Sequence, residues 1–316
     1  MVTILVFGSL VRVLSRIVLI AAVAVLAGCG GDDEGSGEGE PAARTQVVAG
    51  FYPLAWAAER IGGDAVEVTN LTPPGAEPHD VELSARDVGD VRSADLLLLL
   101  GAGFQPALED AAQEADGRVV DVLDGLELLE GSEEGHDEEH EGEEEEHEEG
   151  ASDPHVWLDP LRFAEIVERI GTELSAPVAR DALVGDLRAL HESFDEGLAD
   201  CKRRELVTSH AAFAYFAERY DLEQIPIAGL SPEAEPTPRR LEEVVEHVRE
   251  SGATTIFFET LVSPRIAETV ARETGARTAV LNPLEGLTGE EIDAGADYLS
   301  VMRDNLATLR AALECR

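Results

Sequence analysis

The stretch VARDALVGDLRALHESFDEGLADCK, residues 178–202, predicts a long helix in the middle of the chain. Its apolar residues recur at helical spacing: Leu183, Leu187, Leu190, Phe194 and Leu198. Because proline suits a first helical turn and breaks a helix interior, we expect Pro177 to divide the helical region 160–204 into two pieces. One uninterrupted helix of this length would be a stiff strut that restricts hinge motion between the parts it joins.

Short apolar or β-branched runs alternate with helical stretches on both sides of this helix. The runs before it are QVVAG, AVEVTN, DLLLLLG and RVVDV, and those after it are ELVTSH, QIPIAG, TTIFFET and TAVLNP. Strands that alternate with helices favour βαβ units and parallel sheets. The sequence therefore predicts an α/β protein with an N-terminal lobe over residues 46–159, a helical region over 160–204 and a C-terminal lobe over 205–316.

The composition limits the class of function. The chain has 316 residues, 44% of them hydrophobic, which is ample for packed cores and more natural for two domains than for one. Its formal net charge of −41 argues against a nucleic-acid partner, because phosphate binding relies on clustered lysine and arginine. The same charge suits a protein that deals with cations.

The N-terminus indicates export. Arg12 and Arg16 precede the apolar run IVLIAAVAVLAG, which is short for a bilayer span but right for a secretory signal, predicted over residues 1–28. The run ends in LAGC, which resembles the bacterial lipobox and predicts lipidation of Cys29; a plain signal peptide or a short anchor is the alternative. Residues 29–45 have the polar, glycine-rich composition of a tether. We expect a lipoprotein anchored to the outer face of the cytoplasmic membrane, where more than one acyl chain is needed for stable binding.

Two further cysteines, Cys201 and Cys315, have no close cysteine neighbour in the sequence. Outside the cytoplasm such a pair favours a disulfide, which would fasten the C-terminal helix to the end of the strut. A metal site built from them is the alternative, but they lack the close CxxC spacing of thiolate zinc sites. We therefore expect them to be bridged.

The chain has eight histidines, which are the first candidates for metal ligands. His191 and His247 lie in helical patterns with no partner signal, and we interpret them as surface residues or as residues whose hydrogen bonds are satisfied, rather than as ligands. His79, His155 and His210 each lie where a predicted strand gives way to a loop or helix, and ligands of open α/β sheets bind outside the carboxyl ends of strands. One such histidine would be an ordinary capping or turn residue. Three of them, spread over the chain, indicate a shared site.

Six segments in order carry a resemblance to a known family: PGAEPHDVEL, DPHVWLDP, TSHAAFAYFAERYDL, GLSPEAEPTPRRLEEV, FFETLVSPRIAE and LNPLEGL. From residue 46 to the C-terminus the chain resembles the metal-binding solute-binding proteins of bacterial ABC transporters, most closely the zinc-uptake members. The resemblance implies two α/β lobes joined by one long helix and a metal in the cleft between them. It implies that His79, His155 and His210 are the ligands, and that an ABC permease with its ATPase is the partner.

The predicted ligands favour zinc (Zn2+) as the transported ion. Imidazole suits zinc, whereas Mn²⁺ prefers more carboxylate oxygens. The resemblance adds that relatives carrying manganese or iron commonly have a carboxylate at the position of His210. The family often has an aspartate as fourth ligand at the position of Asn282. We expect Asn282 to take the fourth position by holding a water that binds the metal. Direct coordination by its amide oxygen and a site with only three protein ligands are the alternatives. We expect Glu259 to orient a ligand histidine from behind.

The run EEGHDEEHEGEEEEHEEG, residues 133–150, lies in a predicted loop over residues 131–150. Many zinc-uptake relatives have an acidic, histidine-rich loop between the first two ligand histidines, which is where this run stands. A charge run without histidine would be a solvated linker. With His136, His140 and His147 among its carboxylates, it would concentrate and bind cations. Because ordering such a segment costs entropy, we predict a low-affinity zinc collector or sensor.

Other functions fit parts of the pattern. Three histidines with an open fourth position also describe a catalytic zinc, but the sequence has no HExxH or other hydrolase signature, so we expect no enzymatic activity. A manganese or iron transport protein and a metal-dependent adhesin are further alternatives. We predict a monomeric, extracytoplasmic protein that captures Zn2+ and hands it to an ABC permease.

Overall fold

The computed structural model describes residues 43–131 and 152–316. Residues Ala42–Arg316 form one compact unit. Four residues to which the sequence assigns a role lie outside the described residues: Cys29, His136, His140 and His147. Within the two described ranges, no helix has both the length and the apolar character that crossing a membrane requires.

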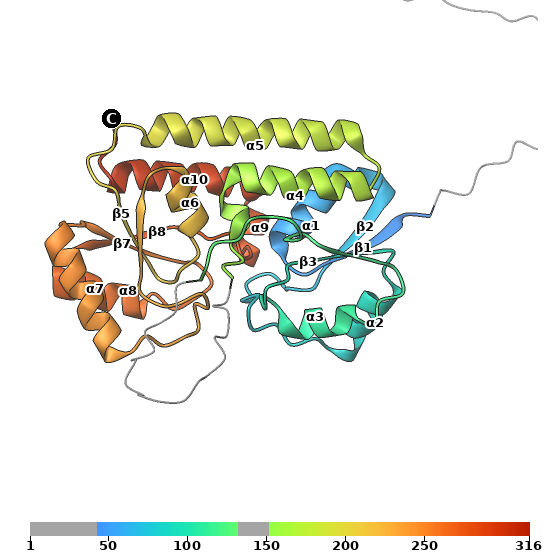
Figure 1. Ribbon diagram of the computed structural model, residues 1–316, viewed down its shortest axis with the longest axis horizontal. Coiled ribbons are helices and arrows are strands. Elements are labelled where there is room, and N and C mark those ends of the chain that lie inside the picture. Colours follow the sequence, from blue (N-terminus) through green and yellow to red (C-terminus); the bar gives the residue numbers. More distant parts are fainter. Residues whose placement is uncertain (1–42, 132–151) are drawn as a thin grey trace, which may run out of the picture. The chain divides into compact units, whose positions relative to one another are not determined.

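The N-terminal lobe is built on a parallel sheet with the strand order β2-β1-β3-β4 (Figure 1). Its elements are β1 (Thr45–Ala49), α1 (Tyr52–Gly62), η1 (Gly63–Ala65), β2 (Val66–Asn70), α2 (Ala85–Ser93), β3 (Leu96–Leu99), α3 (Pro106–Ala112) and β4 (Arg118–Asp121). Successive side chains of a strand point to opposite faces, so Val47 packs with α1 whereas Val48 packs with α2 and α3. Burial on both faces explains why the central strand β3 is a continuous apolar run, whereas the edge strands β2 and β4 also contain exposed polar residues.

The C-terminal lobe repeats this topology, with the strand order β6-β5-β7-β8. Its elements are β5 (Glu205–Thr208), α6 (Ala214–Arg219), β6 (Glu223–Pro226), α7 (Pro238–Ser251), β7 (Thr255–Phe258), α8 (Arg265–Thr274) and β8 (Arg277–Val280). Val207 and Ile256 pack with α7 and α8, whereas Leu206 and Phe257 belong to the core on the other face. The predicted α/β class with two lobes is therefore confirmed.

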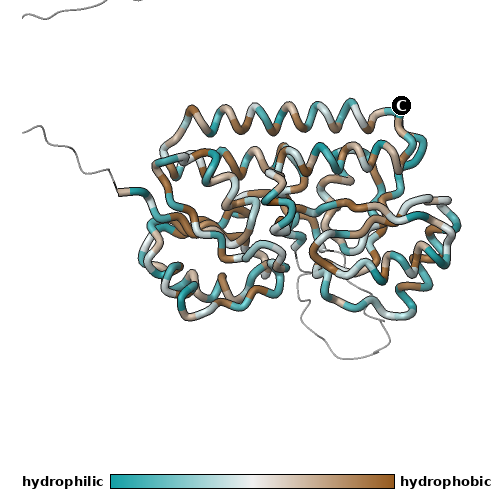
Figure 2. Tube along the Cα trace, turned by 180° about the vertical axis from the view of Figure 1, so that it is seen from behind, coloured by the Kyte–Doolittle hydropathy of each residue, from teal (hydrophilic) through white to brown (hydrophobic). Residues whose placement is uncertain are grey.

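The helical region between the lobes is divided at Pro177 into α4 (Pro160–Glu173) and α5 (Pro177–Leu198), as the sequence predicts. The buried stripe of α5 contains every apolar residue named for it above, and it packs on α4, α1 and α10 (Tyr298–Ala312). Figure 2 shows apolar residues recurring along this helix. Because α1 belongs to one lobe and α10 follows β8 in the other, α5 is packed against both lobes along its length. The short helix α9 (Gly289–Asp293) precedes α10.

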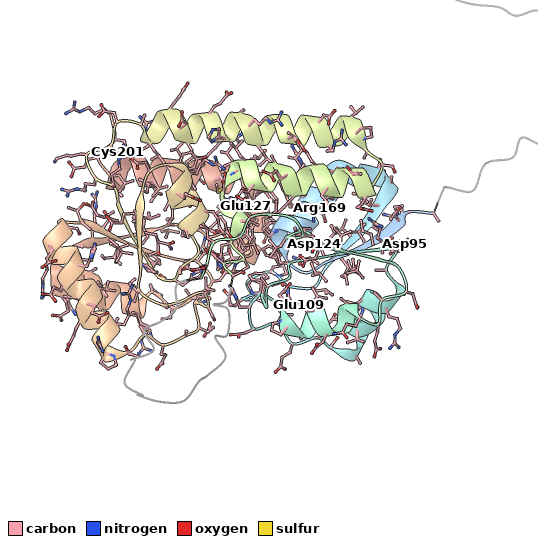
Figure 3. The ribbon with its side chains drawn as sticks, viewed as in Figure 1. Asp95, Glu109, Asp124, Glu127, Arg169 and Cys201 are labelled. Atoms are coloured by element: carbon pink, nitrogen blue, oxygen red, sulfur yellow. A yellow bond between two sulfur atoms is a disulfide. The ribbon has the colours of Figure 1, made fainter. Side chains whose placement is uncertain are left out.

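Cys201 and Cys315 form the expected disulfide, and Cys201 lies just beyond the end of α5 (Figure 3). It fastens the end of α5 to the end of α10, the last helix of the chain. Helix α5 itself ends at Leu198, earlier than the sequence pattern indicated, and the guanidinium of Arg204 donates hydrogen bonds to the carbonyls of Leu198 and Ala199. These bonds satisfy carbonyl groups that the end of a helix leaves without a partner.

Candidate metal centre

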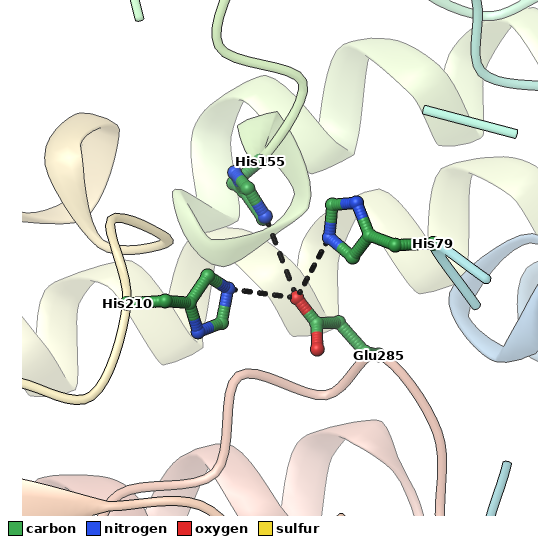
Figure 4. Close-up of side chains that lie close together, drawn as sticks. All are labelled: His79, His155, His210 and Glu285. Carbon is green, nitrogen blue, oxygen red and sulfur yellow. Dashed lines mark hydrogen bonds and ion pairs between the residues drawn. The ribbon is translucent and has the colours of Figure 1, made fainter. Parts of the chain in front are cut away.

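Four side chains from distant parts of the sequence meet between the lobes. His79 lies in the loop after β2, His155 lies directly before η2 (Val156–Leu158), and His210 lies just after β5. The fourth is Glu285, from the loop after β8 (Figure 4). The possible ligand atoms of these residues all lie within 4.8 Å of one another. His155, His210 and Glu285 are buried, and the His79 side chain is 10% exposed.

The three distances from Glu285 to the histidines match those expected between ligands of a four-coordinate metal. Oε1 of Glu285 lies 3.5 Å from Nε2 of His79, 3.4 Å from Nε2 of His155 and 3.1 Å from Nε2 of His210. Around a tetrahedral zinc with bonds of roughly 2.0–2.1 Å, neighbouring ligand atoms lie about 3.3 Å apart. The three contacts that converge on Glu285 therefore have the length of the edges of such a tetrahedron.

The cluster also contains buried polar atoms that the protein does not satisfy. Nε2 of His79, Nε2 of His155 and Oε2 of Glu285 have no hydrogen-bond partner among the described residues. Buried polar atoms of folded proteins nearly always have a partner. A metal cation that accepts lone pairs from these atoms would remove the free-energy cost of burying them without a partner.

Carboxylates hold two of the histidines from behind. Oε1 of Glu259 lies 2.7 Å from Nδ1 of His210, which is the contact expected of an orienting residue. Oδ1 of Asp153 makes the same contact with Nδ1 of His155, also at 2.7 Å, and accepts the backbone N–H of His155. A carboxylate on Nδ1 leaves Nε2 free to ligate and fixes the direction of the ring.

Opposite charges within the cluster shift the pKa values of its members in opposite directions. Burial lowers the pKa of His210, but the negative charges of Glu259 and Glu285 outweigh it and raise that pKa well above its usual value. Burial raises the pKa of Glu285, but the charge of His210, which also contacts its Oε1 at 3.1 Å, and the two nearby imidazoles hold it well below its usual value. The carboxylate of Glu285 is thus ionised and faces a positive charge. A divalent metal ion supplies that charge when it displaces protons from the imidazoles.

Trp157 joins the segment of His155 to the loop of Glu285. Its indole Nε1 donates a hydrogen bond of 2.8 Å to the carbonyl of Pro283, and its own carbonyl accepts one of 2.6 Å from the hydroxyl of Tyr298. Trp157 is fully buried. The loop that carries Glu285 is therefore fixed to both the His155 segment and α10.

Asn282, the expected fourth residue, is engaged in shaping that loop. Its Oδ1 accepts the N–H of Leu284 at 2.7 Å, and its Nδ2 donates to Thr260 and Glu291. Leu284 has a φ of 57°, a left-handed conformation that bulky residues rarely adopt. The Asn282 turn supports this conformation, and the chain reversal delivers Glu285, not Asn282, to the histidines.

Sequence reasoning missed Glu285 for that reason. The residue stands in the LNPLEGL motif, so its proximity to Asn282 along the chain was visible. The left-handed turn at Leu284, however, depends on contacts with Trp157 and Asn305 from distant segments. His191 and His247 stay outside the cluster as expected, and Nδ1 of His191 lies 3.2 Å from the hydroxyl of Tyr220.

Two α/β lobes with matching topology, a helix packed along both, and a cluster of imidazoles and carboxylate between them are the architecture that the sequence resemblance implies for metal-binding solute-binding proteins. The chain belongs to the family described as zinc-uptake complex component A, periplasmic, whose model matches residues 47–312. This is a family of uptake components rather than enzymes, in agreement with the sequence prediction.

Similar proteins of known name fall in the same class. The high-affinity zinc uptake system protein ZnuA of Bacillus subtilis is 34% identical over 94% of this chain and 96% of that protein. The zinc-binding lipoprotein AdcA of Streptococcus pneumoniae is 36% identical over 84% of this chain, which spans only 55% of AdcA. This chain thus spans about half the length of the AdcA relatives it matches.

Solved structures have the same fold. The Zn(II)-bound ZnuA-like domain of Streptococcus pneumoniae AdcA superposes on this chain with a TM-score of 0.71 at 34% identity. The match covers 86% of this chain and 100% of that domain. The laminin-binding protein Lmb of Streptococcus agalactiae, described as bifunctional with adhesin and metal-transporting activity, has a TM-score of 0.74 at 29% identity over 85% of this chain and 99% of Lmb.

Proposed function

We propose that this protein captures Zn²⁺ outside the cytoplasm and delivers it to an ABC permease driven by an ATPase, with His79, His155, His210 and Glu285 as the ligands. The observation that carries the proposal is the convergence of three imidazole nitrogens on one buried carboxylate at the spacing of a tetrahedral site. The zinc-binding and zinc-uptake relatives support the same conclusion.

The donor set favours zinc over manganese. Three neutral nitrogens and one carboxylate in tetrahedral arrangement suit Zn²⁺, which imposes no other geometry through its d electrons. Manganese prefers more oxygen ligands and stands lowest among the divalent first-row metals in its affinity for nitrogen donors. Glu285 supplies the negative charge, whereas Asn282 keeps the loop in shape.

Three parts of the proposal concern residues or properties outside the described structure. Lipidation of Cys29 would anchor the protein to the outer face of the membrane through its tether. His136, His140 and His147 would collect zinc weakly beside the tighter site. The protein would act as a monomer that docks to the permease.

Metal analysis tests the central claim. We expect protein purified without chelator to contain one tightly bound zinc per chain, and competition titration to show weaker binding of manganese. The physical reason is the largely buried set of three imidazole nitrogens and one carboxylate described above. Protein that retains no zinc under these conditions, or that prefers manganese, would contradict the proposed function.

Two substitutions separate Glu285 from Asn282 as the fourth ligand. We expect Glu285→Gln to weaken zinc binding at least tenfold, about 1.4 kcal/mol, because a neutral amide replaces the buried anion that faces the cation. Asn282→Asp keeps the oxygen that accepts the N–H of Leu284 but turns a carboxylate oxygen toward Glu291 in place of a donor, so we expect it to disturb the loop and to bind zinc no more tightly than wild type. Competition titration measures both. Markedly tighter binding by Asn282→Asp would instead place residue 282 on the metal.

A further inference from the structure

His79 is the histidine of the cluster with the least direct support. Its backbone N–H makes a long hydrogen bond of 3.4 Å to Glu77, within its own loop. Among the described residues, no carboxylate contacts the Nδ1 of His79 in the way that Asp153 and Glu259 contact the other two histidines. Apart from the contact of its Nε2 with Glu285, the His79 ring is therefore oriented by the backbone of its loop and by the ring of Phe104, whose centroid lies 4.5 Å away.

Gln105 ties that backbone to the sheet. It precedes α3, and it is only 3% exposed. Its amide Nε2 lies 3.2 Å from the carbonyl of Pro78, the residue before His79. The same nitrogen lies 3.2 Å from the carbonyl of Gly50 and 3.3 Å from the hydroxyl of Thr72. One side chain thus joins the end of β1, the segment after β2 and the loop of His79.

The surroundings of Gln105 are built to hold it. The hydroxyl of Thr72 donates to the carbonyl of Gly50 at 2.7 Å, so the three groups form a closed network. Gly50 is required for space, because a Cβ there would lie 2.3 Å from Oε1 of Gln105. Neither alanine at position 50 nor a bulkier side chain would leave room for the amide in this position.

The C-terminal lobe contains a matching arrangement around His210. Nε2 of Gln224 donates to the hydroxyl of Thr208 at 3.0 Å and to the carbonyl of His210 at 3.1 Å. The hydroxyl of Thr208 donates to that same carbonyl at 2.7 Å. In each lobe, a glutamine amide hydrogen-bonded to a threonine hydroxyl donates to a carbonyl at or next to one histidine of the cluster, that of Pro78 in the first lobe and that of His210 in the second. The threonine reaches that carbonyl only in the C-terminal lobe, because Thr72 donates to Gly50 instead.

We propose that Gln105 is a positioning residue for His79: its amide holds the His79 loop where Nε2 reaches the metal, and it thereby sets the rate at which zinc is lost. The inference rests on the proposed function, because it gives Gln105 a role only if the cluster binds metal. A merely structural role for Gln105 would affect the whole N-terminal lobe, whereas a positioning role acts through His79 alone.

A double-mutant cycle distinguishes the two roles. Gln105→Met keeps the length of the side chain and removes its donated hydrogen bonds. In the full chain, we expect it to weaken zinc binding about tenfold and to speed dissociation into a chelator by a similar factor, as the loss of one or two buried hydrogen bonds predicts. In a His79→Ala background the same substitution should change zinc affinity by less than about twofold, because the group it positions is absent.

The controls make each outcome informative. Gln113→Met replaces an exposed glutamine at the end of α3 and should leave zinc affinity unchanged. If Gln105→Met fails to fold, Thr72→Val removes one hydroxyl of the same network, and the same cycle is measured with it. Equal losses with and without His79, or no loss in either background, would overturn the inference while leaving the proposed function intact. Wild-type protein that binds no zinc would overturn both.

Discussion

Replacing His210 with alanine is expected to weaken zinc binding by roughly 100- to 1000-fold. The estimate follows from a free energy of about 10–16 kcal/mol for a four-ligand zinc site, shared among four ligands. The loss also leaves Glu259 and Glu285 buried with one cationic partner fewer, since His210 contacts both carboxylates. Competition titration against a chelator of known affinity measures the effect.

Unfolding experiments check that the loss concerns the site. A ligand that binds only the folded state stabilises it in proportion to the logarithm of its concentration over Kd. Zinc should therefore raise the unfolding free energy of wild-type protein and do so far less in His210→Ala. His247→Ala, on α7 and outside the cluster, is the matched control and should behave as wild type. Retention of wild-type zinc affinity by His210→Ala would remove His210 from the ligand set.

The fold was predictable mainly because the central strands of both sheets are buried on both faces. Each of the eight apolar runs named from the sequence contains or overlaps one strand, from β1 at Thr45–Ala49 to β8 at Arg277–Val280. Such strands have no polar face and stand out as apolar runs, whereas the edge strand β2, VEVTN, alternates between apolar and polar residues. Helix ends were less predictable: α5 ends at Leu198, where Arg204 from beyond its end donates to the carbonyls of Leu198 and Ala199.

The site was predictable only in part. His79, His155 and His210 stand beside recognisable turns, so local sequence was enough to single them out. Glu285 depends on the left-handed residue Leu284 and on contacts across the fold, and Asp153 on the bend that returns its carboxylate to His155. The contacts of Glu285 join distant segments that carry no common signal, whereas Asp153 stands two positions before His155 in DPHVWLDP and could have been singled out locally.

Replacing both cysteines of the disulfide with serine is expected to lower the unfolding free energy by about 5 kcal/mol in the chain-entropy model. The bridge joins residues separated by 114 positions in the sequence, so the reduced, unfolded chain gains much conformational freedom. At roughly 2–4 °C for each kcal/mol, the melting temperature should fall by roughly 10–20 °C. Thermal and urea unfolding of the Cys201→Ser, Cys315→Ser variant measure this loss.

Zinc affinity should be nearly unchanged in this variant, because other contacts hold the two chain segments together in the folded state. The N–H of Arg316 donates to the carbonyl of Asp200, and the N–H of Arg203 donates to that of Leu313. Glu314 pairs with both Lys202 and Arg203. The disulfide therefore acts mainly on the unfolded chain, whereas the metal site depends on loops at the other end of the strands. A loss of stability below about 1 kcal/mol, or two reactive thiols in denatured, unreduced protein, would contradict this account.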